Sequence, residues 1–332
     1  MRLVIYEWCC SGGVSGDLVS EGRTMFEAVV ADALRERCFE VTALVSETCP
    51  LRLPAGVRVR SVPPGADREA LVAAAAAADI SLVIAPETDG VLADRVAGVR
   101  AAGGTPLACD ASFLDLAADK QATVTALAAA GVPVAAGRAL APGEPWPVGF
   151  HVPAVGKARQ SAGCEGFVVV RHGDRPPPAS IPLRIETLVP GMPVGVSCLC
   201  GPAGIHPLPP LQQVCAAGGT PRYLGAVGIT DAARGGRAAE LARRAVAAVA
   251  RASGGAARGW VGVDMILGAR SDGTADRVLE VNPRLTTSFA HHARDGVASL
   301  LATAIRIAAG STLDEPGAAR TAETMRPEVA CP

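Results

Sequence analysis

The sequence is poor in aromatic residues, net charge and long apolar runs. Its 332 residues include 31 basic and 32 acidic side chains, giving a formal net charge of −1, and only 3% are aromatic. Such a balance provides no electrostatic footprint for nucleic acid or for an anionic membrane. The apolar stretch at 70–85 is interrupted by Asp79 and is too short to span a bilayer. These absences favour small-molecule partners, with no nucleic acid and no membrane.

The cysteines form no Cys-x-x-Cys pair, although the chain has ten of them. The chain is too long for a disulfide-stapled miniprotein, so reduced thiols are the simpler interpretation. The opening residues, MRLVIYEWCC, contain one Arg and only a short apolar run before Glu7, which is unlike a signal peptide. We therefore expect a cytoplasmic protein. Cys198 and Cys200 lie two residues apart in an apolar run and are interpreted as small buried side chains.

Strand and helix patterns alternate in the first third of the chain. The predicted elements are strands at 2–6, 41–45 and 80–85 and helices at 21–37 and 68–78. This alternation predicts an open α/β domain with a parallel sheet. Ligands of such sheets bind at the carboxyl ends of the strands. Glu7 and Glu87 both lie just past a predicted strand end and are candidates for substrate binding.

The remaining two thirds of the chain predict a mixed α+β region. We expect helices at 110–130, 234–253 and 297–309, and strands at 152–157, 166–170, 183–188, 194–199, 260–267 and 277–281. The last 20 or so residues have little periodicity and are expected to be loosely ordered. The predicted division is 1–108 (N-terminal α/β domain), 109–190 (central subdomain), 191–312 (C-terminal subdomain with a metal site) and 313–332 (tail).

The most specific motif is Leu279-Glu280-Val281-Asn282-Pro283-Arg284. Glu280 and Asn282 are two residues apart on a strand and therefore face the same side. Both offer oxygen ligands, which Mg²⁺ prefers, and Asp264 places another carboxylate on a neighbouring predicted strand. A guanidinium such as that of Arg284 beside a metal suits a transferring phosphoryl group. An ordinary hairpin with polar residues is the alternative, but the whole string makes it the weaker one.

Two lysines precede this motif in the chain. Lys120 opens a predicted helix, and Lys157 ends a predicted strand before a loop that contains Gly163 and Gly166. A lysine at a strand end can reach phosphates while loop amides cradle them. Either lysine alone would be an ordinary solvated side chain. Their order and spacing relative to the downstream carboxylates are what indicate a phosphate site.

The segment Glu186-Thr187-Leu188 is extended and ends at Pro190-Gly191. Such a segment can offer backbone N–H and C=O groups to an adenine edge, with apolar side chains enclosing the ring. By itself, the segment fits a plain core strand better than a nucleotide site.

Taken together, these residues resemble the ATP-grasp superfamily in their order over most of the chain. The resemblance implies two α+β subdomains that hold ATP between them, behind an N-terminal domain with an open parallel sheet. It implies that Lys120, Lys157, Gly163, Gly166 and the segment Glu186, Thr187 and Leu188 bind ATP. It further implies that Asp264, Glu280 and Asn282 hold Mg²⁺ or Mn²⁺, while Arg284 and Lys157 act on the transferred phosphoryl group.

A narrower resemblance involves the N-terminal residues. Tyr6-Glu7, Ser20-Glu21-Gly22-x-x-Met25, Ala85-Pro86-Glu87-Thr88-Asp89-Gly90 and Asn282-Pro283-Arg284-Leu285-Thr286-Thr287-Ser288 are similar to the tyramine–L-glutamate ligases of methanofuran biosynthesis. One departure concerns the ribose of ATP. Many ATP-grasp ligases carry an acidic residue after the adenine segment, but here the stretch 192–195 has no carboxylate.

The resemblance implies an ADP-forming carboxylate–amine ligase that works through an acyl phosphate. An ammonium group would suit Glu7 or Glu87, and Arg222 is a candidate for the acidic substrate. L-Glutamate and tyramine, or a related amine, are the expected pair, and a homo-oligomer is compatible with the sequence. Two alternatives stay open: a ligase for another pair, such as a dipeptide ligase, and an ATP-binding protein without ligase activity.

Overall fold

We describe the protein from a computed structural model. The structure describes residues 1–13, 16, 18–49, 51, 53–163, 166–216, 223–294 and 298–312. The predicted tail at 313–332 and the candidate residue Arg222 lie outside the described residues. Within the described part of the chain, no helix is both long enough and apolar enough to cross a membrane.

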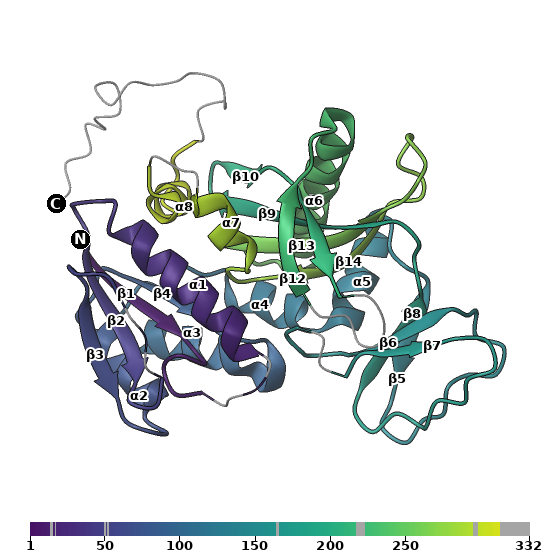
Figure 1. The fold of residues 1–332 in the computed structure, drawn as a ribbon, viewed down its shortest axis with the longest axis horizontal. Coiled ribbons are helices and arrows are strands. Elements are labelled where there is room, and N and C mark those ends of the chain that lie inside the picture. Colours follow the sequence, from purple (N-terminus) through teal and green to yellow (C-terminus); the bar gives the residue numbers. More distant parts are fainter. Residues whose placement is uncertain are drawn as a thin grey trace.

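The N-terminal part contains a four-stranded parallel sheet in the order β3-β2-β1-β4. Its strands are β1 (Arg2–Glu7), β2 (Glu40–Ser46), β3 (Arg58–Val62) and β4 (Ile80–Ile84), and its helices are α1 (Leu18–Ala33), α2 (Asp67–Ala75), the 3₁₀ turn η1 (Thr88–Gly90) and α3 (Val91–Ala101). Side chains of β1 alternate between two cores. Leu3 and Ile5 pack with α1, whereas Val4 and Tyr6 pack with α2 and α3. Helices therefore cover both faces, as expected of a parallel sheet (Figure 1).

Two antiparallel sheets follow. The smaller has the order β5-β8-β6-β7, and the larger has the order β12-β11-β9-β13-β14 with β10 paired to β9. The smaller sheet consists of β5 (Gly137–Leu140), β6 (Ala154–Ala158), β7 (Val168–Val170) and β8 (Leu183–Thr187). The larger consists of β9 (Met192–Gly201), β10 (Gly204–Pro207), β11 (Leu211–Cys215), β12 (Tyr223–Gly228), β13 (Gly259–Leu267) and β14 (Arg277–Asn282). The smaller sheet lies apart from the N-terminal sheet, at the opposite side of the molecule (Figure 1).

Helices pack on the larger sheet and join it to the N-terminal part. They are α4 (Ala111–Ala118), α5 (Lys120–Ala129), α6 (Ala232–Ser253), α7 (Ser288–Arg294) and α8 (Leu300–Ala308). Helix α6 buries a stripe of small residues, including Ala238, Ala242 and Ala245, which lets it lie close to the sheet. Cys198 and Cys200 on β9 are fully buried free thiols in this core, in agreement with the sequence interpretation. The predicted fold class, an N-terminal parallel sheet followed by an α+β region, is confirmed, and the structure adds that the two later sheets are antiparallel. The domain borders stay predictions.

One predicted helix is wrong as a single element. The run at 110–130 forms two helices that meet at Asp119, whose backbone is extended (φ −98°, ψ 107°). The Asp119 side chain accepts hydrogen bonds from the amides of Gln121 (2.8 Å) and Ala122 (3.1 Å), so it caps α5. The break makes Lys120 the first residue of a new helix.

Candidate active site

A cavity of about 410 Å³ is lined by residues of the two antiparallel sheets. Most of the predicted site residues line it, although they are spread over more than 160 positions of the chain. They are Lys120, Lys157, Gly163, Glu186, Thr187, Leu188, Asp264, Glu280, Asn282 and Arg284. Glu7, Glu87 and Gly166 are not part of the lining. The structure thus brings the predicted phosphate and metal residues to one place.

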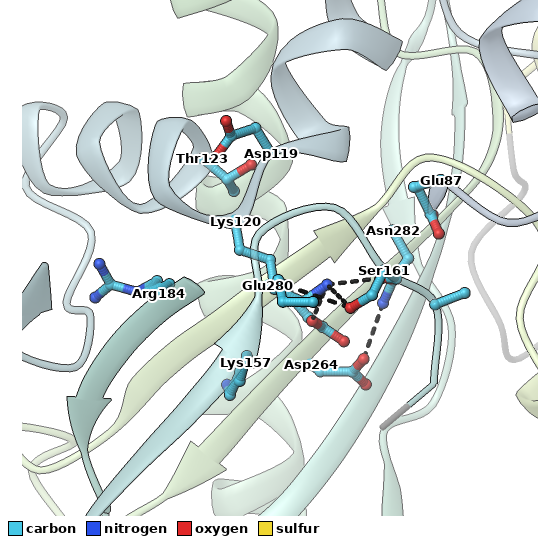
Figure 2. A network of polar contacts seen from close by, with 12 residues as sticks. Glu87, Asp119, Lys120, Thr123, Lys157, Ser161, Arg184, Asp264, Glu280 and Asn282 are labelled. Atoms are coloured by element: carbon cyan, nitrogen blue, oxygen red, sulfur yellow. Dashed lines mark hydrogen bonds and ion pairs between the residues drawn. The ribbon is translucent and has the colours of Figure 1, made fainter. Parts of the chain in front are cut away.

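The acidic wall of the cavity comes from β13 and β14. Asp264 and Glu280 are register partners, and Gly262 is paired with Asn282. The side-chain amide of Asn282 donates to Asp264 Oδ2 at 2.8 Å (Figure 2). The side-chain amide of Gln213 donates to Asp264 Oδ1 at 2.6 Å. Burial, and then the neighbouring Glu280 charge, raise the pKa of Asp264 to about 7. Burial also opposes ionisation of Glu280, but the charges of Lys120 and Lys157 outweigh it and lower the pKa of this carboxyl.

This set of donors fits a divalent cation. Two neighbouring, partly buried carboxylates and an amide oxygen are hard ligands, and Mg²⁺ is usually held by one or two carboxylates, with phosphates and waters completing its shell. Among the residues that the structure describes, no group of three or more His, Cys, Asp or Glu side chains is placed to hold a metal. A cation between Asp264, Glu280 and Asn282 therefore needs oxygen atoms from a substrate as well.

Lys120 reaches the acidic wall from the start of α5. Its Nζ lies 3.4 Å from Glu280 Oε2 and donates to the Ser161 carbonyl at 2.7 Å (Figure 2). The same ammonium lies 3.3 Å from the Ser161 hydroxyl. The side chain of Lys120 is buried, and a buried ammonium requires such partners. Ser161 also lines the cavity, and the sequence analysis assigned it no role.

Lys157 is held by a buried network on the smaller sheet. Its Nζ lies 2.6 Å from Glu186 Oε1, and Arg184 Nε donates to Glu186 Oε2 at 2.9 Å. Arg184 is 1% exposed and also donates to Gln121 Oε1 and to the Ala135 carbonyl. Arg184 was missed by the sequence analysis. The available signal was an Arg two residues before Glu186 on the same predicted strand, where both side chains share a face.

The backbone of the predicted adenine segment is already partly used inside the protein. The amide of Thr187 donates to the Ala136 carbonyl at 2.9 Å, and the amide of Leu188 donates to the Pro153 carbonyl at 2.9 Å. These two donors are therefore occupied in this structure. Glu186, Thr187 and Leu188 all line the cavity, and Val155 and Ile266 are apolar residues of the same lining.

The loop between β6 and β7 contacts the N-terminal part of the protein. Gly163 and Gly166 have positive φ angles of 64° and 66°, which glycine adopts without the strain of a side chain. The amide of Ala162 donates to the Thr88 hydroxyl at 3.3 Å. A side chain at Gly163 would lie 3.1 Å from Leu18 of α1. The loop therefore lies against two segments of the N-terminal part.

Arg284 and the N-terminal carboxylates face each other where the cavity meets the parallel sheet. Arg284 Nε is 3.0 Å from Glu87 Oε1. Glu7 accepts the Cys10 amide at 2.8 Å, and burial raises the pKa of its carboxyl. Both of these carboxylates are buried behind the cavity wall. Glu21, at the start of α1, lines the cavity instead; its only sequence signal was its place in the Ser20-Glu21-Gly22 string.

A parallel-sheet unit, followed by two antiparallel α+β units around one cavity with lysines and carboxylates, defines the class of ATP-grasp folds. Sequence comparison agrees, because the family model of the ATP-grasp domain matches residues 117–288 and that of the pre ATP-grasp 3 domain matches residues 41–112. The chain belongs to the ATP-grasp family. No curated protein matches the sequence significantly.

Solved structures give the same fold. An ATP-grasp superfamily protein from Archaeoglobus fulgidus superposes with a TM-score of 0.69 at 21% identity, over 94% of this chain and 89% of that one. D-alanine–D-alanine ligase from Bacillus anthracis, complexed with ATP, gives a TM-score of 0.60 at 16% identity, over 93% and 97%. L-amino acid ligase from Bacillus licheniformis gives 0.59 at 16% identity, over 88% and 69%. At such identities the likeness establishes the fold.

Proposed function

We propose that this protein is an ATP- and Mg²⁺-dependent ligase that joins a carboxylate to an amine through an acyl phosphate. The observation that carries the proposal is the convergence of Lys120, Lys157 and Arg284 with Asp264 and Glu280 on one cavity. Three fixed cations and a pair of carboxylates suit a polyphosphate and its metal ion. The similarity in fold to proteins named D-alanine–D-alanine ligase and L-amino acid ligase supports the same class of reaction.

The chemistry follows from the poor reactivity of a carboxylate. Transfer of the γ-phosphoryl group turns it into an acyl phosphate, which has phosphate as a leaving group. Lys120 and Lys157 bind phosphate oxygens, and Arg284 holds the phosphoryl group during transfer. Asp264, Glu280 and Asn282 would hold Mg²⁺, which when bound neutralises charge on the β- and γ-phosphates. No covalent nucleophile on the protein is required.

The partial burial of the cationic side chains strengthens their electrostatic interaction with a bound ligand. The side chains of Lys157 and Arg284 are 13% and 12% exposed, so little water screens them from a ligand in the cavity. Both are also held by carboxylates, Glu186 and Glu87, which fix the position of the cationic groups before a ligand arrives. Such fixed charges need little reorganisation during phosphoryl transfer.

For the substrates, we propose L-glutamate and tyramine or a related amine, in the formation of a methanofuran-type one-carbon cofactor. The support is the set of N-terminal and Asn282-to-Ser288 residues that are similar to the tyramine–L-glutamate ligases. Several of these residues, including Glu21, Arg284 and Thr287, line the cavity. A ligase for another amino acid and amine, such as a dipeptide ligase, would differ only in the residues that surround the two substrates.

The test is a product assay. Purified protein is incubated with ATP, Mg²⁺, L-glutamate and tyramine, and the amide is sought by mass spectrometry together with ADP and phosphate. If that pair gives no amide but another pair in an amine and carboxylate panel does, the narrower assignment is wrong and the ligase class holds. ATP binding without turnover on any pair would reject the ligase and favour an ATP-binding protein.

A further inference from the structure

Glu21 occupies a distinctive position in the cavity wall. Among the described residues before Lys120, it is the one that lines the cavity, whereas Glu7 and Glu87 lie behind the wall. Its place is set by the neighbouring Gly22. A side chain at Gly22 would come within 2.6 Å of the Glu7 carboxylate, so glycine lets the first turn of α1 approach the end of β1. The turn thereby presents Glu21 to the cavity.

Glu21 has the wrong charge for the ligands that the neighbouring residues suit. Lys120, Lys157 and Arg284 offer positive charge to phosphates and to a carboxylate, and a further carboxylate in the lining repels both. The Glu21 side chain also has no hydrogen bond and no ion pair at contact distance to any residue in the described ranges. Arg284 acts on it only as a nearby charge, and Arg284 is itself paired with Glu87.

We propose that Glu21 binds the acceptor amine in its ammonium form and thereby selects a cationic amine as the second substrate. This inference rests on the proposed ligase function and deepens it. Of the three substrates of such a ligase, ATP is an anion and the carboxylate reacts through its anionic group, whereas the reacting group of the amine has a charge that complements a carboxylate in the cavity wall. An amino acid that serves as the carboxylate also carries an ammonium group, and hydroxamate formation separates the two cases, because a contact with the carboxylate substrate would be needed there as well. Tyr223 and Thr287 line the same cavity, which gives the amine polar neighbours.

The reaction balances with this assignment. The amine nitrogen forms a bond to the acyl carbon, and the bond between that carbon and the phosphate oxygen breaks, with the electron pair leaving on phosphate. An acyl phosphate dianion and an alkylammonium ion thus give an amide, hydrogen phosphate and one proton. Of the two protons that the ammonium group loses, one is carried by the phosphate and the other passes to solvent. Glu21 holds the ammonium form beside the acyl phosphate until the first proton leaves.

The experiment separates amine binding from carboxylate activation. Hydroxylamine is a small, largely neutral nucleophile that traps acyl phosphates as hydroxamates, so its reaction does not need an ammonium site. We compare the wild-type protein with Glu21→Gln and with Glu27→Gln. Glu27 is an exposed residue of the same helix, in a loose pair with Arg23 at 3.8 Å, and its substitution removes the same charge. Amide formation with the amine and hydroxamate formation with hydroxylamine are both measured.

Glu21→Gln is expected to raise the KM for the amine about tenfold to a hundredfold, the usual cost of losing a hydrogen bond to a charged group. Hydroxamate formation should change by less than twofold, and Glu27→Gln should match the wild type in both assays. An amine KM within twofold of wild type for Glu21→Gln overturns the inference and leaves the ligase proposal standing. A loss of hydroxamate formation in Glu21→Gln that matches its loss of amide formation also overturns the inference. A wild-type protein that forms neither product with any carboxylate rejects the ligase proposal itself.

Discussion

Asp264 and Glu280 lie directly across from each other on β13 and β14, and both carboxylates line the cavity. Each is held in a different way. Asp264 accepts hydrogen bonds from two side-chain amides, whereas Glu280 lies 3.4 Å from the ammonium of Lys120. Two partly buried carboxylates this close require positive charge between or beside them. The pair is therefore the place where removal of one charge should affect turnover most.

Glu280→Gln should abolish turnover and preserve the fold. The change keeps the size of the side chain but removes the charge proposed to hold Mg²⁺, so we expect ADP formation to fall at least about 100-fold. The thermal unfolding midpoint should stay within a few degrees of wild type. Glu240→Gln, in an exposed pair with Arg243 on α6, is the control. A folded Glu280 variant with wild-type activity would show that the metal residues are misassigned.

Arg184→Met should destabilise the protein strongly. The change leaves Glu186 buried at 2% exposure with Lys157 as its remaining cationic partner. Breaking a buried ion pair by removal of one partner costs about 3–5 kcal/mol of unfolding free energy. Arg138→Met, which removes an exposed pair with Glu144, should cost about 1 kcal/mol or less. Denaturant unfolding of both variants measures the difference; equal midpoints would contradict the role given to Arg184.

Two glycine-to-alanine changes should have opposite effects. A methyl group at Gly201 on β9 would overlap the Ile307 carbonyl oxygen, so α8 must move; we expect a loss of about 1–3 kcal/mol. Gly235 lies inside α6 with no atom within 4 Å of the added group. Alanine there should stabilise the helix by about 0.5–1 kcal/mol. Thermal or denaturant unfolding checks both signs, and destabilisation by Gly235→Ala would refute the α6 packing described here.

His292 should make the free energy of unfolding depend on pH in the mildly acidic range. Burial, and then the neighbouring His291, lower the pKa of His292 from 6.5 to about 4. The folded protein thus keeps this imidazole neutral, while the unfolded chain protonates it below about pH 6.5. The unfolded state binds more protons between these two values, so stability falls as the pH falls from about 6.5 to about 4.

His292→Phe tests this dependence, because phenylalanine keeps an aromatic ring beside Trp260 without a titrating group. The difference in unfolding free energy between wild type and variant should change over pH 4 to 6.5 and be constant above it. A difference that does not vary with pH would contradict the assignment. His151→Phe, at an exposed position, serves as the control substitution.

The structure confirms the strands that the sequence analysis predicted from runs of apolar residues. Strands β1, β4 and β13 consist mostly of apolar residues, because most of their side chains are buried. In contrast, β11 and β12 are partly exposed and β3 is mostly exposed, so the sequence analysis missed all three. Helix α7 was missed because it has only seven residues. The helix predicted at 110–130 ran across the break at Asp119 because apolar periodicity continues there, although Lys120 was also interpreted as the start of a helix.

The sequence by itself determined the family and the set of chemical groups at the site. A carboxylate and an amide two residues apart on one strand, with an arginine two residues further on, are a local property, as are a lysine that opens a helix and one that ends a strand. These spacings can be recognised in the sequence without knowledge of the tertiary structure.

The tertiary structure decided which groups face the cavity and which serve them. It placed Glu87 against Arg284, Lys157 against Glu186, and Glu21 rather than Glu7 in the cavity wall. These pairings join elements far apart in the chain, or depend on the close approach of α1 to β1 at Gly22. Spacing along a sequence cannot specify these pairings. The direction in which a buried charged side chain points depends on the partners that tertiary packing brings close to it.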